Sequence, residues 1–198
     1  MRLRDFFLRL TQVLALLALV PLWAQTAARP KVEIRAVRFN LVAVPGTTVR
    51  WLEADLELDT RVLGGPGPFV DRVRVKLGLG ARATGGTYRF YRAEMEAVAL
   101  EAGPAHFRFY LPAEVVKRDG LGGEPEFWSV KITAGGEAQP DTARSVSVAL
   151  REPERLRSFE ARLAAEAPAN DGVLVPQHLS PFVAQYPAAT PSAVRRAQ

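Results

Sequence analysis

A two-residue alternation of apolar and polar side chains, interrupted by glycine and proline, constrains this chain more than any other feature. It extends over residues 31–151, and in WLEADLELDT every second residue from Leu52 to Leu58 is apolar. Such alternation is typical of strands with one buried face, and the Gly and Pro clusters between segments are typical of turns. About seven such segments without a long helix between them predict an all-β fold, an antiparallel immunoglobulin-like β-sandwich. A closed β-barrel is the main alternative.

Two departures from the alternation predict local irregularities in the strands. The apolar phase shifts by one residue at Arg35 and Ala36, as expected of a β-bulge. A second slip lies between Phe90 and Ala93, where we expect a bulge or a strand that changes sheets. The segment ARSVSVAL, residues 143–150, is expected to be the last strand of the sandwich.

The period of the pattern changes after this segment. Leu156, Phe159 and Leu163 recur at helical spacing behind Pro153. This spacing predicts a short amphipathic helix over residues 152–167.

The C-terminal tail, residues 168–198, has no regular period and contains several prolines. We expect it to be extended and partly disordered, with disorder from about Ala188 onward. Its segment GVLVPQHLSPFVAQY is nevertheless apolar, so it either packs back over the sandwich and the helix or docks into a partner. In the second case the expected partner-binding residues are Val173, Leu174, Val175, Leu179, Phe182 and Tyr186.

The N-terminus has the order of a secretory signal peptide. Three arginines among the first nine residues precede an apolar run over residues 13–23, and small residues follow. The run is short for a bilayer span, so we predict a signal peptide over residues 1–24, with cleavage after Ala24 or Ala28. The mature protein is then exported to the periplasm, cell surface or outer envelope, without a stable membrane span. An uncleaved N-terminal anchor is the alternative.

The composition argues against several classes of site. The chain has no cysteine, which removes disulfides, thiol catalysis and thiolate metal ligands. Its 26 Lys and Arg residues against 21 Asp and Glu residues give a net charge of +5, too mixed to indicate nucleic-acid binding. The two histidines, His106 and His178, lie in unrelated segments, and we expect His106 to be exposed on its strand. We therefore expect no enzyme, no catalytic residue, no cofactor and no metal.

One row of carboxylates, Glu53, Asp55 and Glu57, projects from a single face of its predicted strand. If this strand forms a hairpin with the next one, the expected pairs are Glu57 with Arg72, Asp55 with Arg74 and Glu53 with Lys76. Facing cations lower the pKa of a carboxylate, whereas a general acid needs a raised pKa. We interpret the row as a solvated cross-strand charge ladder rather than a catalytic or calcium site. An immunoglobulin topology that places the two strands in different sheets would break this pairing.

The aromatic residues support an alternative function. An exposed aromatic platform would make the protein a carbohydrate-binding or adhesin sandwich with a glycan as partner. The competing interpretation places the rings in the core and at its rims. The candidate rings are Trp51, Tyr88, Tyr91, Tyr110 and Trp128.

The chain resembles a family of exported, pilus-like immunoglobulin-fold proteins of Akkermansia and related bacteria. The resemblance covers about residues 31–186 and lies in the export signal, the strands KVEIRAVRFN and RWLEADLELD, the turn LPAEVVKRDGL and the tail NDGVLVPQHLSPF. It implies a non-catalytic envelope protein that contacts an envelope or pilus-like assembly protein, as an accessory of a type IV pilus-like or secretion system. Pro21 interrupts the segment that would become the assembly helix of a pilin, which argues against a filament subunit.

Overall fold

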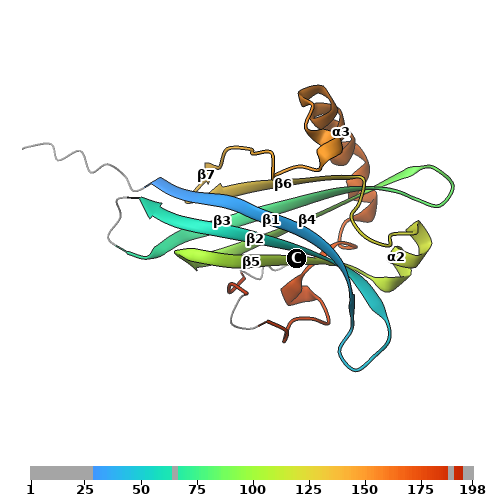
Figure 1. Cartoon of the computed structure of the whole chain (residues 1–198), viewed down its shortest axis with the longest axis horizontal. Coiled ribbons are helices and arrows are strands. Elements are labelled where there is room, and N and C mark those ends of the chain that lie inside the picture. The colour runs from blue at the N-terminus through green and yellow to red at the C-terminus, as the bar shows by residue number, and fades with distance from the viewer. Residues whose placement is uncertain (1–28, 64–66, 187–189, 194–198) are drawn as a thin grey trace, which may run out of the picture.

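The computed structural model describes residues 29–63, 67–186 and 190–193, so the predicted signal peptide over residues 1–24 lies outside the described part. Within it, two sheets pack face to face, and helix α3 lies against the outside of one of them (Figure 1). The strands are β1 (Arg29–Ala43), β2 (Arg50–Leu63), β3 (Phe69–Arg82), β4 (Tyr88–Glu101), β5 (Gly103–Leu111), β6 (Phe127–Ala134), β7 (Glu137–Ala138) and β8 (Val175–Pro176). The helices are α2 (Ala113–Asp119) and α3 (Pro153–Glu166), with short 3-10 turns at Val148–Leu150, Ala167–Asn170 and Gln177–Leu179.

The strand order identifies the architecture. The first sheet has the order β1-β2-β5-β8, the second has the order β4-β3-β6-β7, and every pairing is antiparallel. The chain therefore crosses between the sheets after β2, after β4, after β5 and after β7. This arrangement confirms the predicted immunoglobulin-like sandwich. It differs from a constant-type immunoglobulin domain in β4, which pairs with β3 instead of joining the sheet of β5.

The apolar faces of the two sheets form one core. Leu56 and Leu58 of the first sheet and Val75 and Leu77 of the second are at most 1 % exposed. Each such side chain contributes roughly 1.5–3 kcal/mol when it is removed from water. The apolar residues of the alternating pattern are therefore the ones whose side chains face the core.

The predicted bulge in β1 is confirmed. Its register against β2 shifts between Ile34 and Ala36, so that Arg35 is the extra residue. A bulge with a charged side chain protects an edge strand from pairing with another chain, and β1 is an edge of its sheet.

The predicted hairpin between the acidic row and the following basic strand is wrong. β2 lies between β1 and β5, whereas β3 lies between β4 and β6 in the other sheet. The two strands share an apolar alternation because their inner faces meet across the core, not because they are hydrogen-bonded neighbours. The basic row finds its partners on β4, where Arg74 contacts Glu96 at 2.7 Å and Lys76 contacts Glu94 at 3.4 Å.

The predicted irregularity between Phe90 and Ala93 is also wrong, because β4 keeps one register against β3 through this stretch. The change of apolar phase in the sequence arises because β4 is buried on both faces. Tyr91 is buried in the core between the sheets, while Phe90 is buried on the outer face in contact with Phe159 of α3. A strand covered on both sides loses its alternation without a bulge.

The prediction of a last strand over residues 143–150 is also wrong. Only Val146 bridges to β6, opposite Ser129, and the chain then turns through Val148–Leu150. Val146 and Leu150 turn toward Phe159 and form a second, smaller apolar cluster with it. The segment thus connects the sandwich to α3 instead of extending the sheet.

Helix α3 confirms the predicted amphipathic helix. Phe159 is buried, and Leu156 and Leu163 are half-buried against the outer face of the second sheet. Two glycines of β3 allow this approach. A Cβ atom at Gly78 would lie 2.4 Å from a methyl carbon of Leu163, and one at Gly80 would lie 3.0 Å from the Phe159 ring. Among the described helices, none is long and apolar enough to cross a bilayer.

Candidate functional site

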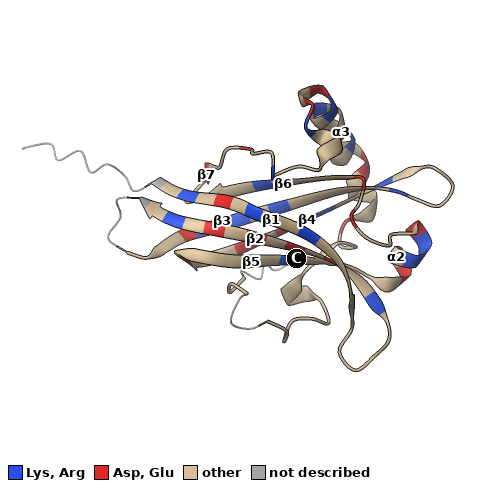
Figure 2. Cartoon of the chain, viewed as in Figure 1, with Lys and Arg blue, Asp and Glu red and all other residues tan. Residues whose placement is uncertain are grey.

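The acidic row lies on the outer face of the first sheet, where basic residues of β1 lie beside acidic residues of β2 (Figure 2). At one end of this face the prediction of a charge ladder holds, with partners other than those expected. Glu57 accepts a hydrogen bond from Arg38 of β1 at 2.9 Å. Asp59 lies 3.1 Å from Arg35 and 2.9 Å from Arg61, and the bonds from these two arginines lower the pKa of Asp59.

Asp55, in the middle of the face, contacts β5 rather than β3. Its carboxylate lies 2.8 Å from Nδ1 of His106 and 3.4 Å from Nε of Arg108. The His106 side chain is 24 % exposed, so it is half-buried rather than exposed as expected. The Arg108 side chain is only 6 % exposed, which is unusual for an arginine on the outside of a sheet.

Glu53, at the other end, is not part of a solvated surface. It is 5 % exposed and accepts a hydrogen bond of 2.7 Å from the hydroxyl of Tyr110. Burial raises the pKa of Glu53, and the nearby charge of Asp55 adds to the rise, against the bonds from Tyr110 and Asn40 and the charge of Arg108. The prediction of a facing cation that lowers this pKa is therefore wrong.

The C-terminal segment covers this end of the face. We call residues 175–186 and 190–193 the C-terminal cover. Phe182 is fully buried, with its ring stacked on Tyr110 at a centroid distance of 4.4 Å and in a T-shaped contact with Trp51 at 5.9 Å. The Arg108 guanidinium lies 4.3 Å from the ring centroid of Tyr186 and donates a hydrogen bond of 3.2 Å to Thr190.

A single buried amide organises the cover. Nε2 of Gln177 donates to the carbonyl oxygens of Phe182 and Gln185 at 3.1 and 2.6 Å. Its Oε1 accepts a bond from the Thr190 hydroxyl at 3.0 Å. Residues 177–185 are thereby closed into a compact loop, and β8 joins this loop to the sheet by pairing with Phe109 and Tyr110.

The tail therefore packs back on the sandwich, the first of the two alternatives. Among the six predicted partner-binding residues, Leu174 and Phe182 are buried, and Val173 and Val175 are half-buried. Leu179 and Tyr186 are exposed, at 56 % and 46 %. The sequence prediction omitted Val183, which is 55 % exposed, and Gln177, whose role has no signature in the sequence.

The predicted disorder from Ala188 lies partly outside the described residues. Within the described part of that range, Thr190 is hydrogen-bonded to Gln177 and Ala193 bridges to Ala97 of β4. In its described parts the tail thus lies at the edge of β5, through β8, and at the edge of β4, through Ala193. It closes the side of the sandwich where these two edges meet.

A second buried polar cluster, missed in the sequence, fixes helix α2 to the sandwich. Asp119 is 1 % exposed and accepts hydrogen bonds from Tyr91 and from Arg118, with Arg89 3.2 Å away. Burial acts to raise the pKa of Asp119, but these bonds and charges outweigh it and hold the pKa below its ordinary value. Burial and the bond to Asp119 raise the pKa of Tyr91 to about 12. Gly120 ends the helix in the left-handed conformation, with φ of 67°.

Most of the aromatic rings proposed for a sugar platform are inside the protein. Tyr91 and Tyr110 are fully buried. Trp128 is 7 % exposed, and its indole N–H donates to Glu124 at 2.7 Å. Trp51 and Tyr88 are half-buried.

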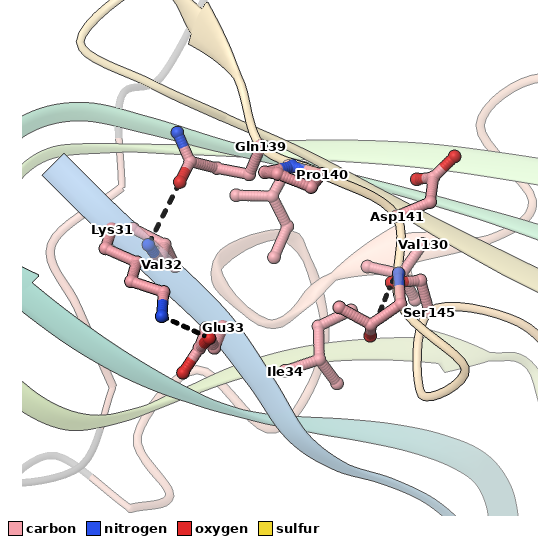
Figure 3. Close-up of a pocket in the computed structure, with 11 residues that line it drawn as sticks. Lys31, Val32, Glu33, Ile34, Val130, Gln139, Pro140, Asp141 and Ser145 are labelled. Atoms are coloured by element: carbon pink, nitrogen blue, oxygen red, sulfur yellow. Dashed lines mark hydrogen bonds and ion pairs between the residues drawn. The ribbon is translucent and has the colours of Figure 1, made fainter. Parts of the chain in front are cut away.

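A small hollow opens at the edge of β1, between the two sheets (Figure 3). Its volume is about 60 Å³, and Val32, Ile34 and Val130 contribute its apolar lining. The side chain of Gln139 points into the edge of the strand, where its Oε1 accepts the backbone N–H of Val32 at 3.1 Å (Figure 3). Gln139 thus occupies a backbone donor that an edge strand would otherwise offer to another chain. We interpret this hollow as edge protection rather than a ligand site.

The fold and the covered face define the class of protein as an immunoglobulin-like β-sandwich whose C-terminal segment forms part of its outer surface. No group of three or more His, Cys, Asp or Glu side chains placed to hold a metal ion occurs among the described residues.

The chain is similar in fold to a solved protein from Akkermansia muciniphila, with a TM-score of 0.69 and 13 % sequence identity. The likeness covers 86 % of this chain and 96 % of that one, and at this identity it concerns the fold alone. No family model matches the sequence, and no curated protein matches it.

Proposed function

We propose that this protein is a non-catalytic exported envelope protein that acts through protein–protein contacts. The observation that carries the proposal is that the loop of the C-terminal cover has one side buried on the sheet and the other side exposed. Phe182 anchors the loop on the sheet, while Leu179, Val183 and Tyr186 are 46–56 % exposed. Apolar side chains held outward by a buried anchor are typical of a surface that another protein covers.

The backbone at Tyr186 supports a constrained presentation of this loop. Its φ of 56° lies in the left-handed region, which bulky residues rarely adopt. Such a conformation is unfavourable by about 1–3 kcal/mol and persists only where the surroundings enforce it. Here the Thr190 hydroxyl, whose one proton is shared with Gln177 Oε1, lies 3.0 Å from the Tyr186 carbonyl oxygen, and Arg108 packs against the ring.

The acidic row supports the non-catalytic part of the proposal. Asp55 is engaged by His106 and Arg108, and Glu57 is engaged by Arg38. Glu53 lies beneath the cover with the Tyr110 hydroxyl on its carboxylate. A general acid or base must reach a substrate, whereas each of these carboxylates contacts another side chain of the same protein.

The finer assignment is an accessory of a type IV pilus-like or secretion system, in contact with an envelope or assembly protein. It is supported by the family resemblance of the sequence and by the fold shared with the protein from Akkermansia muciniphila. Export is supported by the arginines and apolar run of the N-terminus. N-terminal sequencing of the protein from its native host should find Gln25 or Arg29 first, and an intact Met1 would contradict export by cleavage.

The structure leaves few of the candidate aromatic rings exposed for the alternative function, a glycan-binding platform. Tyr91, Tyr110 and Trp128 are unavailable for stacking on a sugar because they are buried. Trp51 is half-buried with Phe182 against it. We therefore keep protein contact as the proposed function.

The test replaces the outward side chains and keeps the anchor. We expect a Leu179→Ser, Val183→Ser variant, which leaves Tyr186 on Arg108, to fold normally and to lose the proteins that bind the unchanged chain in extracts of native envelopes. Val148→Ser is the matched control, because Val148 is 72 % exposed on the far connection to α3. Equal recovery of the same proteins by the double variant would show that the loop is not the contact surface.

A further inference from the structure

We propose that helix α3 and the outer face of the second sheet form a binding pocket for a small organic monoanion with an aromatic or short aliphatic body. The hollow between them has a volume of about 280 Å³. Its walls come from four separate parts of the chain, namely β4, β6, the turn Val148–Leu150 and α3. The apolar lining residues are Phe90, Phe127, Ala149, Leu150 and Phe159.

Aromatic rings give the pocket its floor. Phe159 meets Phe90 at a centroid distance of 5.9 Å and Phe127 at 6.2 Å, with interplanar angles of 47° and 45°. The rings pack on one another, with Phe90 2 % and Phe159 5 % exposed, so they form a closed apolar floor against which a flat apolar body can lie. Gly80 of β3 lies beneath Phe159 and lets the ring approach the sheet, so the floor depends on a glycine that a larger residue would displace.

Three polar residues of the pocket lie on one face of α3. Arg155, Ser158 and Arg162 follow one another at spacings of three and four residues, so they share one face of the helix. The Arg162 guanidinium lies 4.6 Å from the centroid of the Phe90 ring, directly beside the apolar floor. This is the arrangement of small-molecule sites, in which an apolar cavity carries a few convergent polar groups.

The charges at the rim favour one negative charge on the ligand. Arg155 pairs with Glu152 at 3.0 Å, and Arg162 pairs with Glu166 at 2.9 Å. The side chains of both pairs are 43–66 % exposed, and exposed pairs contribute little, so a carboxylate can take over the guanidinium groups.

Glu126 lines the same pocket and accepts a hydrogen bond of 2.7 Å from Tyr88. Its negative charge disfavours a second anionic group on the ligand. The volume lies near the lower end of small-molecule pockets, roughly 300 Å³, so we expect one ring or a short chain.

Amide NMR of the purified protein, titrated with phenylpropionate and with its uncharged amide phenylpropionamide, tests this site directly. We expect saturable shifts at Phe127, Ala149 and Ser158, without shifts in the C-terminal cover. The amide should bind at least about tenfold more weakly, because it cannot pair with the arginines. Shifts that do not saturate, that lie elsewhere, or that are equal for both compounds would overturn the proposal.

Two variants, with a third as control, separate the apolar and the charged parts of the pocket. Ala149→Leu fills the hollow and should abolish the shifts, whereas Ala161→Leu on the exposed side of α3 should leave them unchanged. Arg155→Gln alters an exposed side chain and should weaken phenylpropionate several-fold while leaving phenylpropionamide unaffected. Full affinity in Ala149→Leu, or equal effects of Arg155→Gln on both compounds, would contradict the assignment; if Ala149→Leu does not fold, Arg155→Gln decides.

Discussion

Glu53 shows how one residue changes character when a distant segment covers it. On β2 it continues the row of Asp55 and Glu57, and its own strand gives no reason to bury it. The aromatic ring of Tyr110 and the cover remove it from water. Its environment is therefore set by residues far along the chain, which is why the alternation of β2 predicts its face and not its pKa.

The raised pKa of Glu53 gives a prediction with a definite sign. The native protein holds a proton on Glu53 at pH values where the unfolded chain, with a pKa near 4.5, has released it. The free energy of unfolding therefore falls as pH rises from below 4.5 through the raised native pKa. Glu53→Gln removes this titration, so urea unfolding over a pH series should show a smaller fall and a variant at least as stable as the unchanged protein at neutral pH.

Asp59→Asn is the control of opposite sign. The native pKa of Asp59 is lowered by the bonds from Arg35 and Arg61, so its contribution is present above its ordinary pKa of 3.8 and is lost as pH falls through the native value. Asp59→Asn should therefore be less stable at neutral pH and approach the unchanged protein in acid. Parallel pH profiles for the Glu53→Gln variant and the unchanged protein would contradict the burial of an ionisable Glu53.

Phe182 provides the second residue-scale prediction. It is fully buried and stacked on Tyr110, whereas its neighbour Val183 is 55 % exposed. Phe182→Ala should lower the free energy of unfolding by about 3–5 kcal/mol, the usual range for a buried phenylalanine. Val183→Ala should stay within about 0.5 kcal/mol. Urea unfolding measures both, and equal small effects would mean that the loop does not rest on the sheet.

At the scale of elements, helix α3 depends on glycines in the strand beneath it. Leu77 and Leu79 alternate inward along β3, and Gly78 and Gly80 alternate outward where the helix lies. The sequence predicts the helix from its own period, but not where it docks. Two glycines at alternate positions on the polar side of a strand are the sequence signal for a helix that docks on that face.

Gly80→Val tests this dependence. A Cβ atom at Gly80 would already lie 3.0 Å from Phe159, 3.2 Å from Phe90 and 3.3 Å from Phe127, so a branched side chain must displace the rings. We expect destabilisation by about 2–3 kcal/mol, as for other overpacked sites. Gly122→Val is the control, because no atom lies within 4 Å of a Cβ there.

A double-mutant cycle with Phe159→Ala separates the clash that Gly80→Val makes with the Phe159 ring from the intrinsic preference of a β-strand for valine over glycine. Once the Phe159 ring is removed, Gly80→Val should be less unfavourable by at least about 0.5 kcal/mol, because two residues in contact do not act additively. Additive effects in urea unfolding would show that α3 does not press on Gly80.

Strand pairing shows what the sequence leaves open at this scale. The faces of β2 and β3 and the bulge in β1 follow from the positions of apolar residues, and these predictions are confirmed. The partner of each strand does not follow, because Val75 and Leu56 belong to one core, and their inward alternation is the same whether the two strands pair in one sheet or face each other from two sheets. β4 misleads for a related reason, since Phe90 is buried by α3 on the face that should be polar.

For the whole molecule, the C-terminal segment belongs to the sandwich. Leu174 is 3 % exposed and lies in the main core, β8 pairs with β5, and Ala193 reaches β4. A chain that ends at Asp171 should therefore lose well over about 3 kcal/mol of unfolding free energy, more than Phe182→Ala alone is expected to remove at the low end of its range. A chain that ends at Ala193 keeps every described contact and should unfold like the full chain. Equal denaturation midpoints for the two truncations would show that the tail is dispensable.

The central claim is that the loop of the C-terminal cover faces a protein partner with its outward side chains. A photo-reactive phenylalanine analogue in place of Val183 tests it most directly, because Val183 points away from the sheet next to the buried Phe182. In native envelopes, irradiation should join this position to another protein chain, and the same analogue in place of Val148 should not yield that product. No protein adduct at residue 183, or the same adduct from residue 148, would contradict the account.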